Sequence, residues 1–217
     1  MMIKTVVDLR GSFGPARDQD PRPTCLAFAA SDAHAAARAL PWQDLSTEWA
    51  YYHAIQRGGT HPDDGTTLEA MLDAIKLDGQ PPEGVWPYIQ THVTDLSKWK
   101  PPAPCPTIFF RDNGGCGATP AEIISQLDAG NPVLTIMTTS NAFYRPDKDG
   151  VVDSLEPTVP DRLHAVISAG YGEANARQFI LVRNSWGEGW GLQGYAWLST
   201  NYLIPRLVGA AIMTTEL

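Results

Sequence analysis

The chain has 217 residues, enough to bury a core in one domain or in two tightly packed lobes. With 43% hydrophobic and 18% charged residues, it belongs neither to the disordered nor to the highly charged proteins. The formal net charge of −8 argues against a broad electrostatic grip on nucleic acid, and no apolar run approaches the roughly 20 residues that span a bilayer.

The first half of the chain is predicted to be helical. Residues 25–40 include eight alanines, the best helix formers, and Pro41 is expected to end this helix. Because the run carries few charges, we expect the helix to be buried on most of its circumference.

Two further helices are predicted from their capping residues. Ser46 is expected to cap a helix that runs to about residue 56, with Glu48 favouring the helix dipole in its first turn. Thr66 and Glu69 have the spacing of a capping box for the next helix, which Gly79 is expected to end.

The second half is predicted to be rich in strands. Thr119 and Glu122 form another capping box for one short helix, and residues 111–118 are expected to form a surface loop. Apolar and β-branched runs predict five strands, at residues 133–137, 165–169, 179–182, 195–198 and 210–213. Helices followed by strands predict one α+β domain over residues 1–217, with a helical lobe at about 11–106 and a β lobe at about 107–217 plus the N-terminal strand.

Cys25 is the candidate nucleophile. It falls in the first turn of the alanine-rich helix, where partial positive charge and unbonded N–H groups favour a thiolate. A backbone N–H at that helix end is also a donor for an oxyanion. On position alone, a small buried cysteine remains the more common alternative.

A thiolate nucleophile needs a base, and the base needs a group that orients it. His164 begins one apolar run, and Asn184 closes the strand that follows, so the two side chains can be neighbours across a sheet. The alternatives are a satisfied core histidine at position 164 and plain core packing for Trp186.

Three segments, in the same order, resemble the papain-like cysteine peptidases (clan CA, family C1). The segment 19–29 resembles the family pattern Q-x5-C-x-A-F-[SA], and 163–172 resembles H-A-V-x3-G-Y-G. The segment 183–195 resembles K-N-S-W-G-x-x-W-G-x-x-G-Y, and Asp8-Leu9-Arg10 resembles the D-W-R that opens the mature domain. The resemblance covers about residues 8–200.

The resemblance implies a two-lobe fold, with a helical lobe, an antiparallel β-barrel-like lobe and the active-site cleft between them. It implies a peptidase that hydrolyses peptide bonds through a Cys25 thiolate, a His164 imidazolium and a thioester acyl-enzyme. No metal or cofactor is expected, because the other histidines show no zinc-ligand spacing with cysteines. Asn184 would orient the imidazole, and Trp186 would shield the Asn–His hydrogen bond from water. Gln19 would supply the oxyanion-hole amide together with the backbone N–H of Cys25.

The resemblance also implies positions for substrate contacts. Gly65 would offer backbone hydrogen bonds to an extended peptide, with a simple turn as the alternative. Ile136 and Ala165 match apolar wall positions of the pocket for the second residue before the scissile bond, with ordinary strand core as the alternative. The family's nearby disulfide uses a cysteine at the position of Arg22, and its C-x-G-G partner segment is replaced here by residues 63–66.

The expected partner is a peptide or protein substrate, and neither nucleic acid nor a membrane. Two alternatives keep the fold: an acyl transferase or amide ligase that uses the same residues, and a peptide-binding pseudopeptidase. The intact set Gln19, Cys25, His164 and Asn184 counts against the last.

Only seven residues precede Asp8, so we expect a member without the family's inhibitory propeptide, restrained by other means such as an inhibitory partner. Without a secretory apolar region, a cytoplasmic location is expected, and signal-independent export is the alternative. Cys105 and Cys116 are expected to stay free thiols, or to pair in an oxidising compartment.

Overall fold

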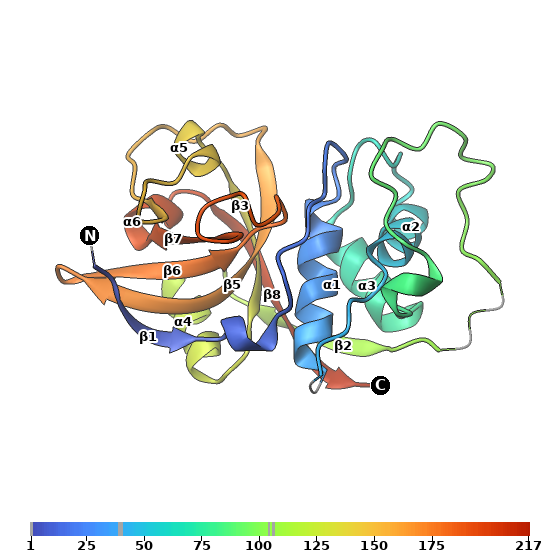
Figure 1. Cartoon of the computed structure of the whole chain (residues 1–217), viewed down its shortest axis with the longest axis horizontal. Coiled ribbons are helices and arrows are strands. Elements are labelled where there is room, and N and C mark those ends of the chain that lie inside the picture. The colour runs from blue at the N-terminus through green and yellow to red at the C-terminus, as the bar shows by residue number, and fades with distance from the viewer. Residues whose placement is uncertain (1, 39–40, 104, 106) are drawn as a thin grey trace. The chain divides into compact units, whose positions relative to one another are not determined.

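The computed structural model describes residues 2–38, 41–103, 105 and 107–217, and its ribbon is drawn in Figure 1. The chain divides into two units. The β unit comprises Met1–Asp18 and Gly115–Ile212, and the helical unit comprises Gln19–Gly114 and Met213–Leu217. Helices and a large, mainly antiparallel sheet are both present, so the predicted α+β class is confirmed.

The helical unit is built on α1 (Cys25–Ala37), α2 (Thr47–Gly58) and α3 (Leu68–Leu77), followed by the 3-10 turn η2 (Glu83–Val85). Every residue of α1 from 26 to 35 is buried, which confirms the expectation that the helix is buried on most of its circumference. The helix ends earlier than expected, because Arg38 has an extended backbone and its guanidinium lies over the ring of Phe109. Residues 39 and 40, which the expected helix included, lie outside the described residues.

The helix caps follow local chemistry. The side chain of Ser46 accepts a hydrogen bond from the N–H of Trp49 and so caps α2, as predicted. The cap of α3 is Thr67, which accepts from Ala70, so the prediction of Thr66 was wrong by one residue. Thr67 has the extended backbone that a cap requires and lies three residues before the N–H that it accepts.

The β unit is organised around one sheet with the strand order β2-β8-β3-β5-β6-β7-β4, and β1 pairs with β5 off this path. The antiparallel pairs include β1 with β5, β3 with both β5 and β8, and β6 with both β5 and β7, whereas β4 runs parallel to β7. The bounds are β1 (Lys4–Asp8), β2 (Arg111–Cys116), β3 (Val133–Thr138), β4 (Val151–Val152), β5 (Leu163–Ala174), β6 (Arg177–Arg183), β7 (Tyr195–Ser199) and β8 (Leu207–Glu216).

The five strands predicted in the second half are all present, each longer at one or both ends than its apolar run. The loop expected at 111–118 is wrong, because Arg111–Cys116 is strand β2. Arg111 is buried at 4% exposure, and its guanidinium donates to the carbonyl of Thr214 at 2.7 Å and pairs with Glu216 at 3.2 Å. These bonds to β8 override the weak strand preference of the two glycines in β2.

Short helices complete the β unit: η1 (Arg10–Ser12), α4 (Pro120–Asp128), α5 (Asn141–Tyr144) and α6 (Thr200–Leu203). Thr119 caps α4 by accepting from the N–H of Glu122, as predicted. Ile123 and Leu127 of α4 are buried in one core cluster with side chains from β3, β5, β6 and β7. Helix α4 is therefore part of the core that supports the sheet.

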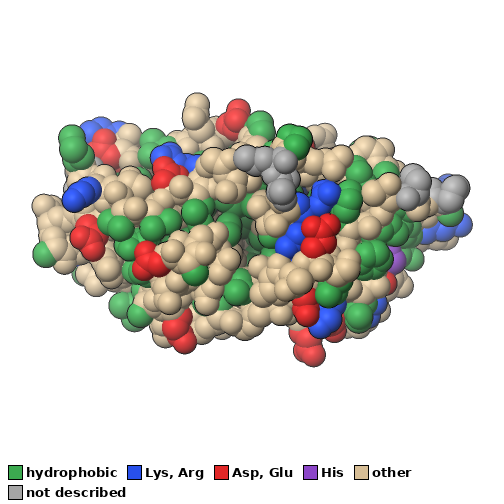
Figure 2. Space-filling model, turned by 90° about the horizontal axis from the view of Figure 1, so that it is seen from below, with side chains coloured by type: hydrophobic (Ala, Val, Ile, Leu, Met, Phe, Trp, Pro, Cys, Tyr) green, Lys and Arg blue, Asp and Glu red, His purple; other side chains and the backbone are tan. Residues whose placement is uncertain are grey.

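No helix in the described ranges is long and apolar enough to cross a membrane. On the face of the molecule seen in Figure 2, Lys and Arg side chains lie among Asp and Glu side chains, with apolar and neutral groups between them.

Candidate active site

His164 and Asn184 are brought together by two neighbouring strands of the β unit. His164 is the second residue of β5, and Asn184 directly follows β6, which pairs antiparallel with β5. The backbone N–H of Asn184 is held by the carbonyl of Gly194 at 2.9 Å. The imidazole Nε2 of His164 lies 2.7 Å from the side-chain Oδ1 of Asn184. The two side chains, 7% and 3% exposed, form one buried hydrogen-bonded pair.

The direction of this hydrogen bond follows from a third group. The Oδ1 of Asn184 also accepts the backbone N–H of Ser185, at 2.9 Å, which fixes Oδ1 as the acceptor end of the amide. The Nε2 of His164 must therefore carry the hydrogen. In the neutral ring, the lone pair is then on Nδ1, and this nitrogen is the one able to accept a proton.

Aromatic rings surround the imidazole. The ring of Trp186 lies 4.8 Å from that of His164 between centroids, and the ring of Phe143 meets the imidazole edge-on at 5.6 Å. Tyr144 stacks on Trp186 at 5.0 Å and 22°. The His164–Asn184 hydrogen bond thus lies beside aromatic rings, and a buried hydrogen bond is stronger in a low local dielectric. Helix α5 supplies both Phe143 and Tyr144.

The turn after Asn184 explains the glycine spacing of its motif. Gly187 has a φ of +69° and donates its N–H to the carbonyl of Arg17 at 3.0 Å. Gly191 has a φ of +58°, and a Cβ there would overlap the carbonyl oxygen of Tyr195. Glycine adopts a positive φ without strain and has no Cβ, so it suits both positions of this turn, which follows Trp186.

Cys25 and Gln19 belong to the helical unit. Cys25 is half-buried. Because it is the first residue of α1, it lies at the positive end of the helix dipole. Gln19 is 7% exposed, and its Nε2 donates to the backbone carbonyl of Arg22 at 2.9 Å. The loop of residues 19–24 thus joins the expected oxyanion amide to the expected nucleophile.

The three residues expected to contact substrate lie in two places. Gly65 of the helical unit is buried, with a φ of +80°, and its carbonyl accepts the hydroxyl of Thr60 at 3.0 Å. Ile136 and Ala165 of the β unit are direct partners across β3 and β5, so their side chains share one face of the sheet. Ile136 is half-buried and Ala165 is 2% exposed.

The sequence patterns did not predict the contacts of several residues near His164 and near Cys25. Phe143 and Tyr144 lie in a stretch that gave no regular pattern. Arg22 and Glu48 pair inside the helical unit, although Glu48 was expected only to favour the helix dipole. The sequence signal at Arg22 was its place at a position where the family that this chain resembles has a cysteine.

The remaining thiols and acidic groups were compared with the arrangement that a metal ion needs. Within the described ranges, no group of three or more His, Cys, Asp and Glu side chains is placed to hold a metal ion. Cys105 and Cys116 are free thiols. Burial, together with the charge of Glu122, raises the pKa of Cys116 above its ordinary value, which lowers its reactivity.

A sequence model described as "Papain family cysteine protease" matches residues 4–210. The chain belongs to this family. Among its members, Papaya proteinase 4 of Carica papaya is 36% identical over 67 residues, which is 31% of this chain and 19% of that protein. Cysteine proteinase 3 of Dictyostelium discoideum is 24% identical over 204 residues, 86% of this chain and 56% of that protein. This chain therefore spans less than two thirds of the length of these relatives.

The fold is likewise that of the family. The crystal structure of xylellain, a cysteine protease from Xylella fastidiosa, superposes with a TM-score of 0.76 and 21% identity. The superposition covers 99% of this chain and 87% of that one. The predicted papain-like fold is thus confirmed.

Proposed function

We propose that the chain is a cysteine peptidase and that residues 1–217 form one peptidase domain. The observation that carries this proposal is the hydrogen bond from His164 Nε2 to Asn184 Oδ1, buried under Trp186 in a chain of the papain family. That bond leaves Nδ1 of His164 as the nitrogen that exchanges protons. A neutral amide suffices as its partner, because a thiolate–imidazolium pair is already ionised near neutral pH.

In the proposed reaction, the Sγ thiolate of Cys25 attacks the carbonyl carbon of the scissile bond. The resulting oxyanion accepts hydrogen bonds from Gln19 Nε2 and the backbone N–H of Cys25. Nδ1 of His164 then gives its proton to the leaving amine, the C–N bond breaks and a thioester remains. A water molecule gives a proton back to Nδ1 and attacks the thioester, which releases the carboxylic acid and restores the thiolate.

The proposed substrates are peptides or proteins with an apolar residue at the second position before the scissile bond. The shared sheet face of Ile136 and Ala165 supports this choice. Gly65 is proposed to pair with the substrate backbone. The free thiols Cys105 and Cys116 fit a reducing compartment, and we propose the cytoplasm.

The test combines covalent labelling with turnover. The reduced protein is treated with an epoxide inhibitor directed at papain-like peptidases, and separately with a fluorogenic peptide that carries the apolar residue. We expect one adduct, on Cys25, and turnover that is lost in Cys25→Ala but kept in the matched variants Cys105→Ala and Cys116→Ala.

Three other outcomes reject the proposal. Turnover that persists in Cys25→Ala excludes this nucleophile. Transfer of the acyl group to an added amine, without hydrolysis, indicates an acyl transferase. Peptide binding without labelling or turnover indicates a pseudopeptidase.

A further inference from the structure

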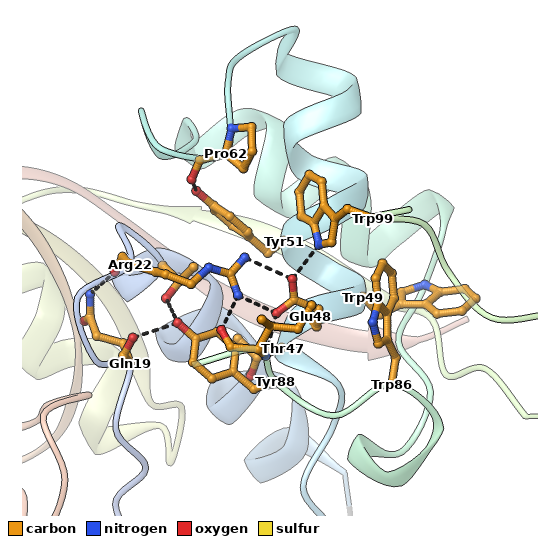
Figure 3. A network of polar contacts seen from close by, with 12 residues as sticks. Gln19, Arg22, Thr47, Glu48, Trp49, Tyr51, Pro62, Trp86, Tyr88 and Trp99 are labelled. Atoms are coloured by element: carbon orange, nitrogen blue, oxygen red, sulfur yellow. Dashed lines mark hydrogen bonds and ion pairs between the residues drawn. The ribbon is translucent and has the colours of Figure 1, made fainter. Parts of the chain in front are cut away.

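Arg22 and Glu48 form an ion pair inside the helical unit, with side chains only 1% and 0% exposed. Nη1 of Arg22 donates to Oε2 of Glu48 at 2.6 Å, and Nη2 donates to Oε1 at 2.9 Å, the parallel two-bond geometry of a strong pair. Nη1 also donates to the carbonyl of Ile89 at 2.5 Å. Figure 3 shows the guanidinium between the loop that carries Arg22 and helix α2.

The environment of Arg22 keeps it charged. Burial by itself lowers the pKa of Arg22, but the hydrogen bonds and the charge of Glu48 outweigh it and leave that pKa above its ordinary value. The rings of Tyr51 and Tyr88 also lie against the guanidinium, at 5.5 and 5.0 Å from its carbon.

Glu48 uses both oxygens to tie three segments of the helical unit together. Oε1 accepts from Arg22 and from the indole Nε1 of Trp99, the latter at 2.6 Å. Oε2 accepts from Arg22 and from the backbone N–H of Ile89, the latter at 3.0 Å. A carboxylate offers about four acceptor positions, and here each oxygen has two donors. The carboxylate thus fixes the loop 19–24 and the segment 89–99 to α2.

Tyr88 fixes the same loop at both ends. Its hydroxyl donates to the backbone carbonyl of Gln19 at 2.7 Å. The hydroxyl of Thr24 lies 2.8 Å from the same phenol oxygen, and because the phenol has one hydrogen, Thr24 is the donor of that bond. Thr24 is the residue directly before Cys25.

The loop also orients its own amide. Nε2 of Gln19 donates to the backbone carbonyl of Arg22, while the guanidinium of Arg22 is held by Glu48. A continuous set of hydrogen bonds therefore leads from α2, through Arg22, to the side chain of Gln19.

We propose that Arg22, Glu48 and Tyr88 are positioning residues for the oxyanion hole. This group, called here the loop clamp, holds the loop 19–24 so that Gln19 Nε2 and the N–H of Cys25 present their hydrogens at a fixed separation. The inference rests on the proposed peptidase function. The loop clamp acts through Gln19 and Cys25 and touches no substrate.

A purely stabilising role does not explain these residues. Removing two charges from water is costly, and replacing a buried ion pair by apolar side chains of similar volume is often neutral or stabilising. What apolar side chains do not supply is direction. The hydrogen bonds of the loop clamp fix which way the carbonyls of Gln19 and Arg22 point, and those carbonyls set the position of the Gln19 amide.

The experiment uses two variants that keep the volume of the interior. Tyr88→Phe removes only the hydroxyl that holds Gln19 and Thr24. The double variant Arg22→Met with Glu48→Leu replaces the ion pair by apolar side chains, so that no unpaired charge is left buried to unfold the protein. The matched control is Tyr51→Phe, because Tyr51 is a buried tyrosine of the same unit and its hydroxyl donates to the carbonyl of Pro62, at 2.6 Å, outside the loop (Figure 3).

Four quantities are measured for each variant: kcat and KM on the fluorogenic peptide, the inhibition constant of a peptide aldehyde, the rate of alkylation of Cys25 by iodoacetamide, and the urea midpoint of unfolding. The aldehyde forms a C–S bond and places its oxygen in the oxyanion hole. Iodoacetamide needs only the thiolate, which displaces iodide. The two reagents therefore separate the oxyanion hole from the nucleophile.

For Tyr88→Phe and for the double variant we expect kcat to fall about 100-fold, because a small misplacement of catalytic donors has this effect. The inhibition constant of the peptide aldehyde is expected to rise by a similar factor, whereas KM and the alkylation rate of Cys25 stay within about twofold of the wild type. Tyr51→Phe is expected to keep kcat, whatever its urea midpoint.

Two results overturn the inference alone: a folded variant that keeps the kcat of the wild type, or an alkylation rate that falls together with kcat. A wild-type protein that shows neither turnover nor labelling of Cys25 overturns the proposed function, and this inference with it. The two failures are therefore distinguishable.

Discussion

His34 should make the stability of this protein sensitive to mild acid. It lies on the buried helix α1 with 0% exposure, and its Nδ1 is 2.9 Å from Oε1 of Gln80. The amide nitrogen of Gln80 donates to Ser31 and to the carbonyl of Ser46, so its Oε1 is the acceptor and His34 Nδ1 is the donor. The lone pair is then on Nε2, a buried atom with no hydrogen-bond partner among the described residues.

The size of this loss of stability follows from the pKa of His34. Burial lowers the pKa of His34 from 6.5 to about 4; the hydrogen bond to Gln80 opposes this in part, and the charges of Arg111 and Arg38 add to it. Because the pKa of His34 is lower in the folded state than in the unfolded state, neutral His34 contributes its full share to the free energy of unfolding above about pH 6.5. This share is lost as the pH falls towards about 4. At about 1.4 kcal/mol per pKa unit the full loss is about 3 kcal/mol, of which about 2 kcal/mol is gone by about pH 5.

Urea unfolding of the wild type and of His34→Asn at about pH 7 and about pH 5 measures this loss directly. Asparagine keeps a donor near the position of Nδ1 but does not titrate. We expect the wild type to lose about 2 kcal/mol more than His34→Asn between the two pH values. The control His61→Asn changes a histidine that is 49% exposed and should keep the wild-type pH dependence. Equal pH dependence in the wild type and His34→Asn would refute the reasoning.

Two further predictions concern the site and the fold. Asn184→Ala removes the acceptor that holds Nε2 of His164, so kcat/KM on the fluorogenic peptide should fall about 100-fold while Cys25 remains open to iodoacetamide; an unchanged rate contradicts the role of Asn184. Gly79→Ala should cost about 3 kcal/mol in urea unfolding and Gly59→Ala about 1 kcal/mol. Both glycines have positive φ, but of the two only Gly79 has neighbours that an added Cβ would meet, the side chain of Ile108 and the carbonyl of Phe109. Equal losses of unfolding free energy in the two variants would show that this contact relaxes without cost.

The elements that the sequence predicted well are those whose signals are local. Ser46 and Thr119 cap helices because a side-chain oxygen reaches an N–H only a few residues ahead. Strand β2 was missed because its stability comes from a partner far along the chain: the buried Arg111 bonds to Thr214 and Glu216 of β8. Pairing of this kind overrides local preference, and no window of sequence contains it.

The candidate site divides in the same way. Motif spacing pointed to His164, Asn184 and Trp186, and the structure brings these three together because strand ends and a glycine turn fix them. The pairing of Arg22 with Glu48 was not predicted, because 26 positions separate the two residues and no local pattern links them. Whether Gln19, Cys25 and His164 act together remains a prediction of the family resemblance.

The residue at position 22 also bears on how the nucleophile loop is held. Proteins that this chain resembles use a disulfide cysteine there, and a disulfide stabilises mainly by restricting the unfolded chain. The pair of Arg22 with Glu48 acts in the folded state instead, and it needs no oxidant to form. A buried ion pair generally adds little net stability, because the desolvation of both charges offsets most of their attraction. Its hydrogen bonds are directional, and through them the two side chains together fix the loop 19–24, the backbone at Ile89 and the indole of Trp99. An ion pair at this position therefore makes physical sense where the orientation of the loop matters more than the free energy of unfolding, as it would if Gln19 and Cys25 are the oxyanion donors that we propose.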